Sequence, residues 1–72
     1  MKRSEIIKTL KAKLKESSVD NFQNIWNHIF EEEQIDKIYN KKDKQYFIDL
    51  FEDEVHFVEN KSLVNAYKKL KS

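Results

Sequence analysis

The residues best suited to chemistry gather between positions 46 and 59, which read YFIDLFEDEVHFVE. On a helix, four of them share one face, and the last two have the i, i+3 spacing of carboxylate-bridged iron sites: Asp49, Glu52, Asp53 and His56. Such sites point into a bundle and need a second helix bearing the same motif. Zinc prefers three or four converging Cys and His ligands, and His28 is the only other histidine in the sequence. We therefore expect no metal ion and no cofactor, and we interpret this cluster as a solvated face.

Catalytic constellations are equally hard to find in the sequence. There is no cysteine, and no serine stands near a histidine that a carboxylate could orient. The sequence also lacks glycine, which removes the loops that let backbone N–H groups approach a phosphate closely. A substrate pocket would take volume from a core that is small to begin with. We therefore expect a protein that is not an enzyme.

Glu54 is the residue that comes closest to indicating a function. If residues 46–58 form one straight helix, Glu54 projects into an apolar face, and an ionised carboxylate is costly in a closed core unless it has a partner. Either the face is open in the isolated chain, or a basic group meets the carboxylate, or the helix does not run straight through. The basic group would belong to a partner or to a lysine of the same bundle, such as Lys13 or Lys37.

Protein–protein interaction is the function we predict, because the chain has more apolar side chains than a short bundle can cover. The expected interface combines apolar and acidic residues of one helix: Phe47, Phe51, Glu54, Val58, Asp49, Glu52 and Asp53. Glu59 and the acidic run at 31–33 extend its charge and would steer it toward a basic surface. We expect a small regulator or inhibitor of another macromolecule, and a homodimer is a specific version of this hypothesis.

Nucleic-acid binding is the alternative. A lysine stripe on the first expected helix would neutralise phosphates without reading sequence, and with the residues just before it the stripe comprises Lys2, Arg3, Lys8, Lys11 and Lys15. The near-neutral balance of charge, +1 at pH 7, and the single arginine weaken this alternative.

The elements that must position these residues are helices. Apolar spacing predicts a first helix that begins at Ser4 and ends at Ser17-Ser18. It predicts a second helix capped by Asp20, with a break within residues 31–33. The apolar residues of this second helix follow the i, i+3, i+4, i+7, i+8 pattern: Phe22, Ile25, Trp26, Ile29 and Phe30.

Three further helices are expected. A short one carries Ile35, Ile38 and Tyr39 and stops at Asn40. The next begins at Asp43 and has an unusually wide apolar arc that extends to residue 58, and the last starts at Asn60 or Ser62. A hairpin over residues 55–64 is the alternative for that region.

Length and composition complete the prediction. The 72 residues suffice for one domain, 1–72, which we expect to be an all-α bundle of four to five short helices with the second and fourth at its centre. The missing cysteines and the lack of an apolar signal segment favour a soluble, cytoplasmic protein without a membrane partner. Thirteen lysines to one arginine are typical of an A+T-rich genome, so we expect an origin in a low-G+C bacterium, in one of its phages or on a mobile element.

Overall fold

The computed structural model describes residues 2–31, 34–36 and 38–71. These residues form four α-helices and one 3₁₀ turn: α1 (Arg3–Glu16), α2 (Val19–Ile29), α3 (Lys41–Glu54), η1 (Val55–Phe57) and α4 (Asn60–Lys71). They contain no β-strand, so the predicted all-α fold is confirmed. The alternative hairpin over residues 55–64 is wrong, because this region holds the 3₁₀ turn and the start of α4.

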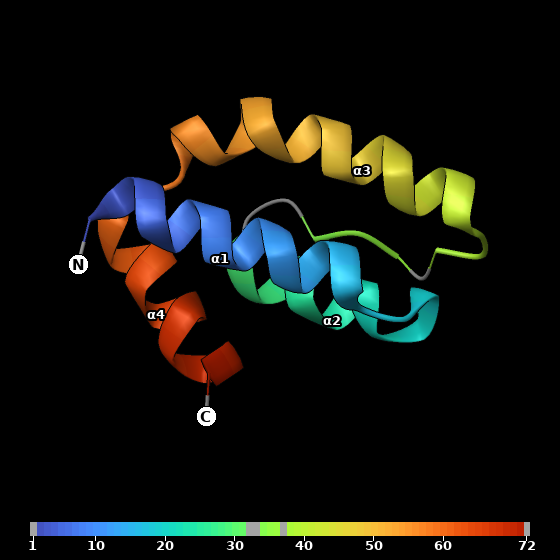
Figure 1. Ribbon diagram of the computed structural model, residues 1–72, viewed down its shortest axis with the longest axis horizontal. Coiled ribbons are helices and arrows are strands. Elements are labelled where there is room, and N and C mark those ends of the chain that lie inside the picture. Colours follow the sequence, from blue (N-terminus) through green and yellow to red (C-terminus); the bar gives the residue numbers. More distant parts are fainter. Residues whose placement is uncertain (1, 32–33, 37, 72) are drawn as a thin grey trace.

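The helices pack into a compact globule with a radius of gyration of 11.2 Å. Helices α1, α2 and α3 run along its long axis, and α4 crosses steeply beneath the N-terminal end of α1 (Figure 1). The expected central place of α2 is confirmed, since α2 contacts each of the other three α-helices. Helix α1 does the same. The fourth expected helix is α3 in the structure, and it packs mainly on α1 and α2, so it is less central than expected.

The buried side chains of the described residues form one apolar cluster to which every α-helix contributes. Its largest members with almost no exposed surface are Phe22, Phe51, Leu10, Leu14, Ile29 and Leu63. None of the buried residues in the described part of the chain is polar or charged. Glu54 is half-buried and does not belong to the closed core.

Helix α2 follows its predicted apolar pattern, and all five residues of that pattern are buried. The predicted cap at Asp20 is wrong. The helix begins at Val19, and the side chain of Ser18 caps it by accepting a hydrogen bond of 3.2 Å from the backbone N–H of Asn21. The helix ends at Ile29, just before the predicted break, and residues 32–33 lie outside the described residues.

Two other predicted helix starts are also wrong. Helix α1 begins at Arg3, with Lys2 at the cap position and no side-chain cap, instead of being capped by Ser4. Helix α3 begins at Lys41, because the side chain of Asn40 accepts a hydrogen bond of 2.9 Å from the backbone N–H of Asp43. Asp43, the predicted cap, thus lies inside the first turn. Helix α4 begins at Asn60, which is one of the two starts predicted for the last helix.

The predicted helix through Ile35, Ile38 and Tyr39 does not form: residues 34–36 and 38–39 are neither helical nor strand. Instead, the side-chain amide of Asn27 pairs with the backbone of Ile35, accepting from its N–H at 2.8 Å and donating to its carbonyl at 3.2 Å. The segment beyond returns toward the start of α3 (Figure 1) and places Ile38 in the core at 3% exposure. Residue 37 lies outside the described residues.

The long helix through Val58 is the last correction. Helix α3 ends at Glu54, a single 3₁₀ turn follows, and Val58 is extended. The guanidinium of Arg3 donates to the carbonyls of Val55 at 3.0 Å and Val58 at 2.8 Å, and it also contacts the Asn60 side chain. The carbonyl of Val55 also accepts from the backbone N–H of Val58 at 3.1 Å, so Arg3 is its second donor and ties the η1 turn to the start of α1. Among the described helices, none has the length and apolar character needed to cross a membrane.

Candidate functional site

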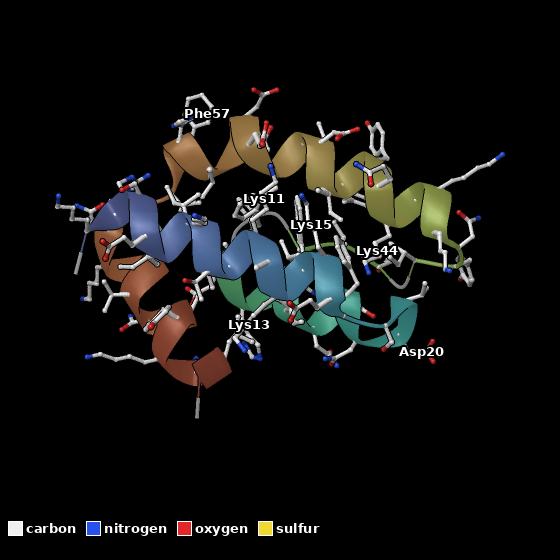
Figure 2. All side chains as sticks on the ribbon, viewed as in Figure 1. Lys11, Lys13, Lys15, Asp20, Lys44 and Phe57 are labelled. Atoms are coloured by element: carbon white, nitrogen blue, oxygen red, sulfur yellow. The ribbon has the colours of Figure 1, made fainter. Side chains whose placement is uncertain are left out.

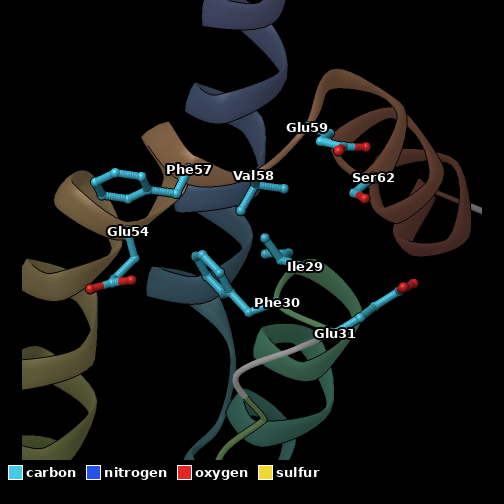
Figure 3. Close-up of a pocket in the computed structure, with 8 residues that line it drawn as sticks. All are labelled: Ile29, Phe30, Glu31, Glu54, Phe57, Val58, Glu59 and Ser62. Atoms are coloured by element: carbon cyan, nitrogen blue, oxygen red, sulfur yellow. The ribbon is translucent and has the colours of Figure 1, made fainter.

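A hollow of the described surface lies where the end of α2 meets the η1 turn and the start of α4 (Figure 3). Its volume is about 250 Å³. The residues that line it are Ile29, Phe30, Glu31, Glu54, Phe57, Val58, Glu59 and Ser62. We call this hollow the junction pocket. Four of its lining residues, Phe57, Val58, Glu59 and Ser62, follow the end of α3 at Glu54, so the pocket forms where the chain turns from α3 into α4.

The floor of the junction pocket is apolar. Ile29 and Phe30 come from the end of α2 and are 1% and 5% exposed, and Val58 follows the η1 turn and is half-buried (Figure 3). The Phe30 ring is held in place by two aromatic neighbours, with ring centroids 4.3 Å from Trp26 and 5.9 Å from Phe51. The floor is therefore part of the core surface and presents a fixed shape to a ligand.

Carboxylates stand around this floor. Glu54 lies on one side, and Glu31 and Glu59 lie on the opposite side, with the apolar side chains between them (Figure 3). The three acids come from three separate segments of the chain. No three His, Asp or Glu side chains in the described part of the chain are placed to hold a metal ion together.

Phe57 borders the pocket and projects from the η1 turn to the outside of the molecule (Figure 2). It is 84% exposed. The described residues leave two other large apolar side chains similarly open, Tyr39 and Tyr46, and neither lines the pocket. Phe57 is thus the exposed aromatic residue that lies beside a concave apolar surface.

The residues predicted to form the apolar part of the interface lie in different environments in the structure. Phe51 is fully buried in the chain's own core, so its side chain is not accessible to a partner. Phe47 is half-buried and packs on Trp26, with ring centroids 5.3 Å apart. Glu54 and Val58 both line the junction pocket. The predicted set therefore does not form one continuous face.

The predicted acidic residues Asp49, Glu52 and Asp53 are all exposed on α3 and lie outside the pocket lining. Glu52 forms an ion pair with Lys11 of α1. The hydrogen bond from Lys11 and the charge of Lys11 hold the pKa of the Glu52 carboxyl below its ordinary value of 4.5, and the charge of Lys15 adds to this effect. This part of the acidic face therefore serves the α1–α3 contact.

The alternative basic surface is partly engaged in the fold. Lys11 is paired with Glu52, and Arg3 donates to the backbone beside η1. Lys2, Lys8 and Lys15 are exposed. Lys44, which was not among the predicted residues, donates to the carbonyls of Lys15 and Ser17 and so stabilises the end of α1 (Figure 2).

Sequence reasoning singled out Glu54 and Val58 and named the acids of residues 31–33 and Glu59 as steering charges. It did not identify Phe57 and Ser62 as site residues, and it assigned Ile29 and Phe30 to the core alone. Phe57 is exposed because α3 ends before it. The sequence indicated this end only through Glu54, whose place in an apolar pattern could be explained by a helix that does not run straight through residues 46–58.

No protein-family model matches this chain, and comparisons with curated proteins and with solved structures find no match either. The geometry of the junction pocket is therefore the feature of this chain that bears on its function.

Proposed function

We propose that this chain is a protein–protein interaction module that regulates or inhibits another macromolecule, and that the partner docks at the junction pocket. The observation that carries the proposal is the exposure of Phe57 beside an apolar floor. Burial of a phenylalanine side chain contributes roughly 1.5–3 kcal/mol. A partner that covers Phe57 would gain this contribution, which the chain alone leaves unused.

The surroundings of Phe57 favour a binding site over the chance exposure of one aromatic side chain on a small protein. The pocket floor is rigidly packed on the core, and pre-formed surfaces lose little entropy when they bind. Aromatic residues at the edge of a pocket are characteristic of the few side chains that supply most of the energy of an interface. Tyr39 and Tyr46 are open too, but they lack an adjoining hollow.

The alternative, nucleic-acid binding through the lysine stripe, has less support. Two of its five residues, Arg3 and Lys11, are used in contacts within the fold. Three exposed lysines remain, and exposed lysines on a helix are ordinary solvated residues. Duplex DNA is nevertheless a useful control ligand, because affinity that falls steeply with salt would favour this alternative.

A peptide-display selection tests the proposal. Random peptides displayed on phage are selected on the full chain, and the enriched peptides are measured against two variants, Phe57→Ser and Tyr39→Ser. Both remove an exposed aromatic ring, but only Phe57 lines the pocket. We expect binding to be lost in Phe57→Ser and kept in Tyr39→Ser. The proposal is wrong if no peptide is enriched, or if the two variants bind alike.

A homodimer is the version of the proposal in which the partner is a second copy. Sedimentation over a range of concentrations identifies it. If the chain dimerises through the junction pocket, Phe57→Ser shifts it to the monomer and Tyr39→Ser does not.

A further inference from the structure

We infer that a second copy of the chain packs antiparallel on the exposed side of α3 and forms a homodimer there. This inference goes beyond the proposed function, because it concerns a surface other than the junction pocket and names the partner. It follows from three features of α3: an exposed row of side chains, an order of charges along this row that complements its own reverse, and an exposed tyrosine near its middle.

One side of α3 is buried in the core and the other is exposed. Ile48 and Phe51 belong to the core, and α3 forms the upper edge of the molecule in Figure 1. The exposed side carries residues at the i, i+4, i+7, i+11 spacing, which places them in one row along a helix. We call this row the outer α3 face, and its residues are all exposed: Lys42, Tyr46, Asp49 and Asp53. The row is about 17 Å long, enough for a second helix to lie along it.

The charges of α3 change sign along the helix. Lys41 and Lys42 lie in its first turn beside one acid, Asp43, and the last turn contains no basic residue. Asp53 is exposed at that end. This order opposes the helix dipole, which favours acids at the N-terminus of a helix and cations at its C-terminus. The arrangement is therefore slightly unfavourable within one chain, and a surface with the reverse order of charges would compensate for it.

A second α3 in the antiparallel orientation has this reverse order. When the two helices overlap over their full length, the first turn of each lies opposite the last turn of the other, so Lys42 of each copy faces Asp53 of the other copy. A two-fold axis makes this contact twice. A parallel pair would instead bring like charges together, which is repulsive. The match does not need Glu52 and Glu54, because Glu52 pairs with Lys11 and Glu54 interacts within the fold.

Tyr46 gives this dimer an aromatic contact near the middle of the helix. Its side chain is 60% exposed, and its ring makes a T-shaped contact with Phe47, with centroids 5.4 Å apart. In the full overlap Tyr46 lies opposite Asp49 of the other copy, to which its hydroxyl can donate. Asp49 accepts from Gln45 at 3.0 Å within its own chain, and an ionised carboxylate takes further donors. Tyrosine suits an interface because its ring is apolar and its hydroxyl forms hydrogen bonds.

Sedimentation equilibrium of the full chain tests the inference. One helix pair makes a small interface, so we expect the chain to associate between about 0.1 and 1 mM, and to associate less when salt screens the charges. Tyr46→Ser should weaken the dimer roughly tenfold, because the ring is no longer covered by the second copy.

Charge reversal separates this dimer from any other. Lys42→Glu puts an acid at both ends of the outer α3 face, and Asp53→Lys puts a cation at both ends. Each variant alone turns two attractive contacts of the dimer into repulsive ones, so dimerisation should weaken roughly tenfold. An equal mixture of the two variants should dimerise again, and so should a chain that carries both substitutions. Lys61→Glu, which reverses an exposed lysine in the first turn of α4, should leave dimerisation unchanged.

These variants are not expected to unfold the chain. Lys42→Glu places a carboxylate in the first turn of α3, and Asp53→Lys places a cation in its last turn, and both placements are the ones that the helix dipole favours. Each variant should therefore be at least as stable as the unaltered chain while it dimerises less. Urea unfolding at a concentration where the chain is monomeric checks this.

A chain that stays monomeric at about 1 mM would overturn the inference. So would a dimer that is insensitive to Lys42→Glu and Asp53→Lys, or a mixture of these two variants that stays monomeric. A dimer that is lost in Phe57→Ser but unaffected by the charge variants lies at the junction pocket, which overturns this inference and supports the homodimer version of the proposed function. A monomeric chain does not affect the proposed function, which the peptide selection tests separately.

Discussion

Arg3 illustrates how much one residue can do in a chain of 72. It is the only arginine in the sequence, and its guanidinium joins three parts of the structure: the N-terminus of α1, the backbone beside η1 and the start of α4. Two of its acceptors are the carbonyls of Val55 and Val58. These bonds hold the turn from which Phe57 projects, so Arg3 acts on the junction pocket without lining it.

Replacing Arg3 with alanine is therefore expected to destabilise the fold. The two part-buried bonds to backbone carbonyls come from a charged donor, and their loss should lower the free energy of unfolding by about 1–3 kcal/mol. Arg3→Lys keeps the charge but not the planar fork, so it should restore only part of the loss. Urea unfolding followed by circular dichroism measures the change.

Lys2→Ala is the control for Arg3→Ala, since it removes an exposed neighbouring cation. Surface changes of this kind usually stay within about 0.5 kcal/mol. If Lys2→Ala and Arg3→Ala unfold at the same urea concentration, the guanidinium does not stabilise the turn.

At the scale of the helix, the starts of α2 and α3 show why local signals mislead. Each start contains two residues able to cap it, Ser18 or Asp20 in α2 and Asn40 or Asp43 in α3, and in each case the earlier one is used. The later residue then lies in the first turn, where a negative charge is favourable near the N-terminus of a helix. Both residues fit the pattern, so spacing alone does not decide between them.

Variants of the α3 start separate the two roles. Asn40→Ala removes the cap and should lower the free energy of unfolding by about 1 kcal/mol, which is roughly 4–8 °C in Tm for a domain of this size. Asn40→Asp keeps an acceptor and should leave stability nearly unchanged. Asp43→Asn loses only its interaction with the helix dipole, a few tenths of a kcal/mol. A larger loss in Asp43→Asn than in Asn40→Ala would show that the helix begins later.

The helices themselves were predictable where apolar periodicity is dense. The pattern of residues 22–30 gave α2 correctly because its five apolar residues leave no other phase. The expected helix rested on only three apolar residues, Ile35, Ile38 and Tyr39, and Ile38 is buried although the described residues around it are not helical. The pairing of Asn27 with the backbone of Ile35, eight residues apart, decides against the helix and has no signature in local sequence.

The end of α3 was unpredictable for a similar reason, and the junction pocket depends on it. The residues that accept from Arg3 lie 52 and 55 positions away from it, so no window of sequence contains both ends of the contact. Glu54 was the one indication in the sequence of where α3 ends, because it is a charged residue within an apolar pattern. The sequence therefore pointed to the location of the pocket but not to its floor.

For the whole molecule, the predicted surplus of apolar side chains is smaller than expected. The wide arc does not exist as one face, because Phe57 and Val58 lie beyond the end of α3 and Phe51 is enclosed. What remains open among the described large apolar side chains is Phe57, Tyr39 and Tyr46. The proposed interaction therefore depends on a small surface around one pocket, and it does not require a partner along the length of α3.

Phe51 and Phe57 make this division testable, because they are the same residue type six positions apart with opposite exposure, 0% and 84%. A domain of 72 residues has a total stability of about 4–11 kcal/mol. Phe51→Ala should remove roughly 3–5 kcal/mol of it and leave the chain largely unfolded or close to it. Phe57→Ala should change stability by no more than about 0.5 kcal/mol.

Urea unfolding measures both variants, with circular dichroism for the helices and the fluorescence of the buried Trp26 for the core. Coincident transitions by the two signals are expected, since the helices share one core cluster. If Phe57→Ala is as damaging as Phe51→Ala, the Phe57 ring is packed within the fold, and a partner has nothing to cover at the junction pocket. If Phe57→Ala is harmless to folding and abolishes peptide binding, the two phenylalanines have separate roles, one in holding the chain together and one in binding.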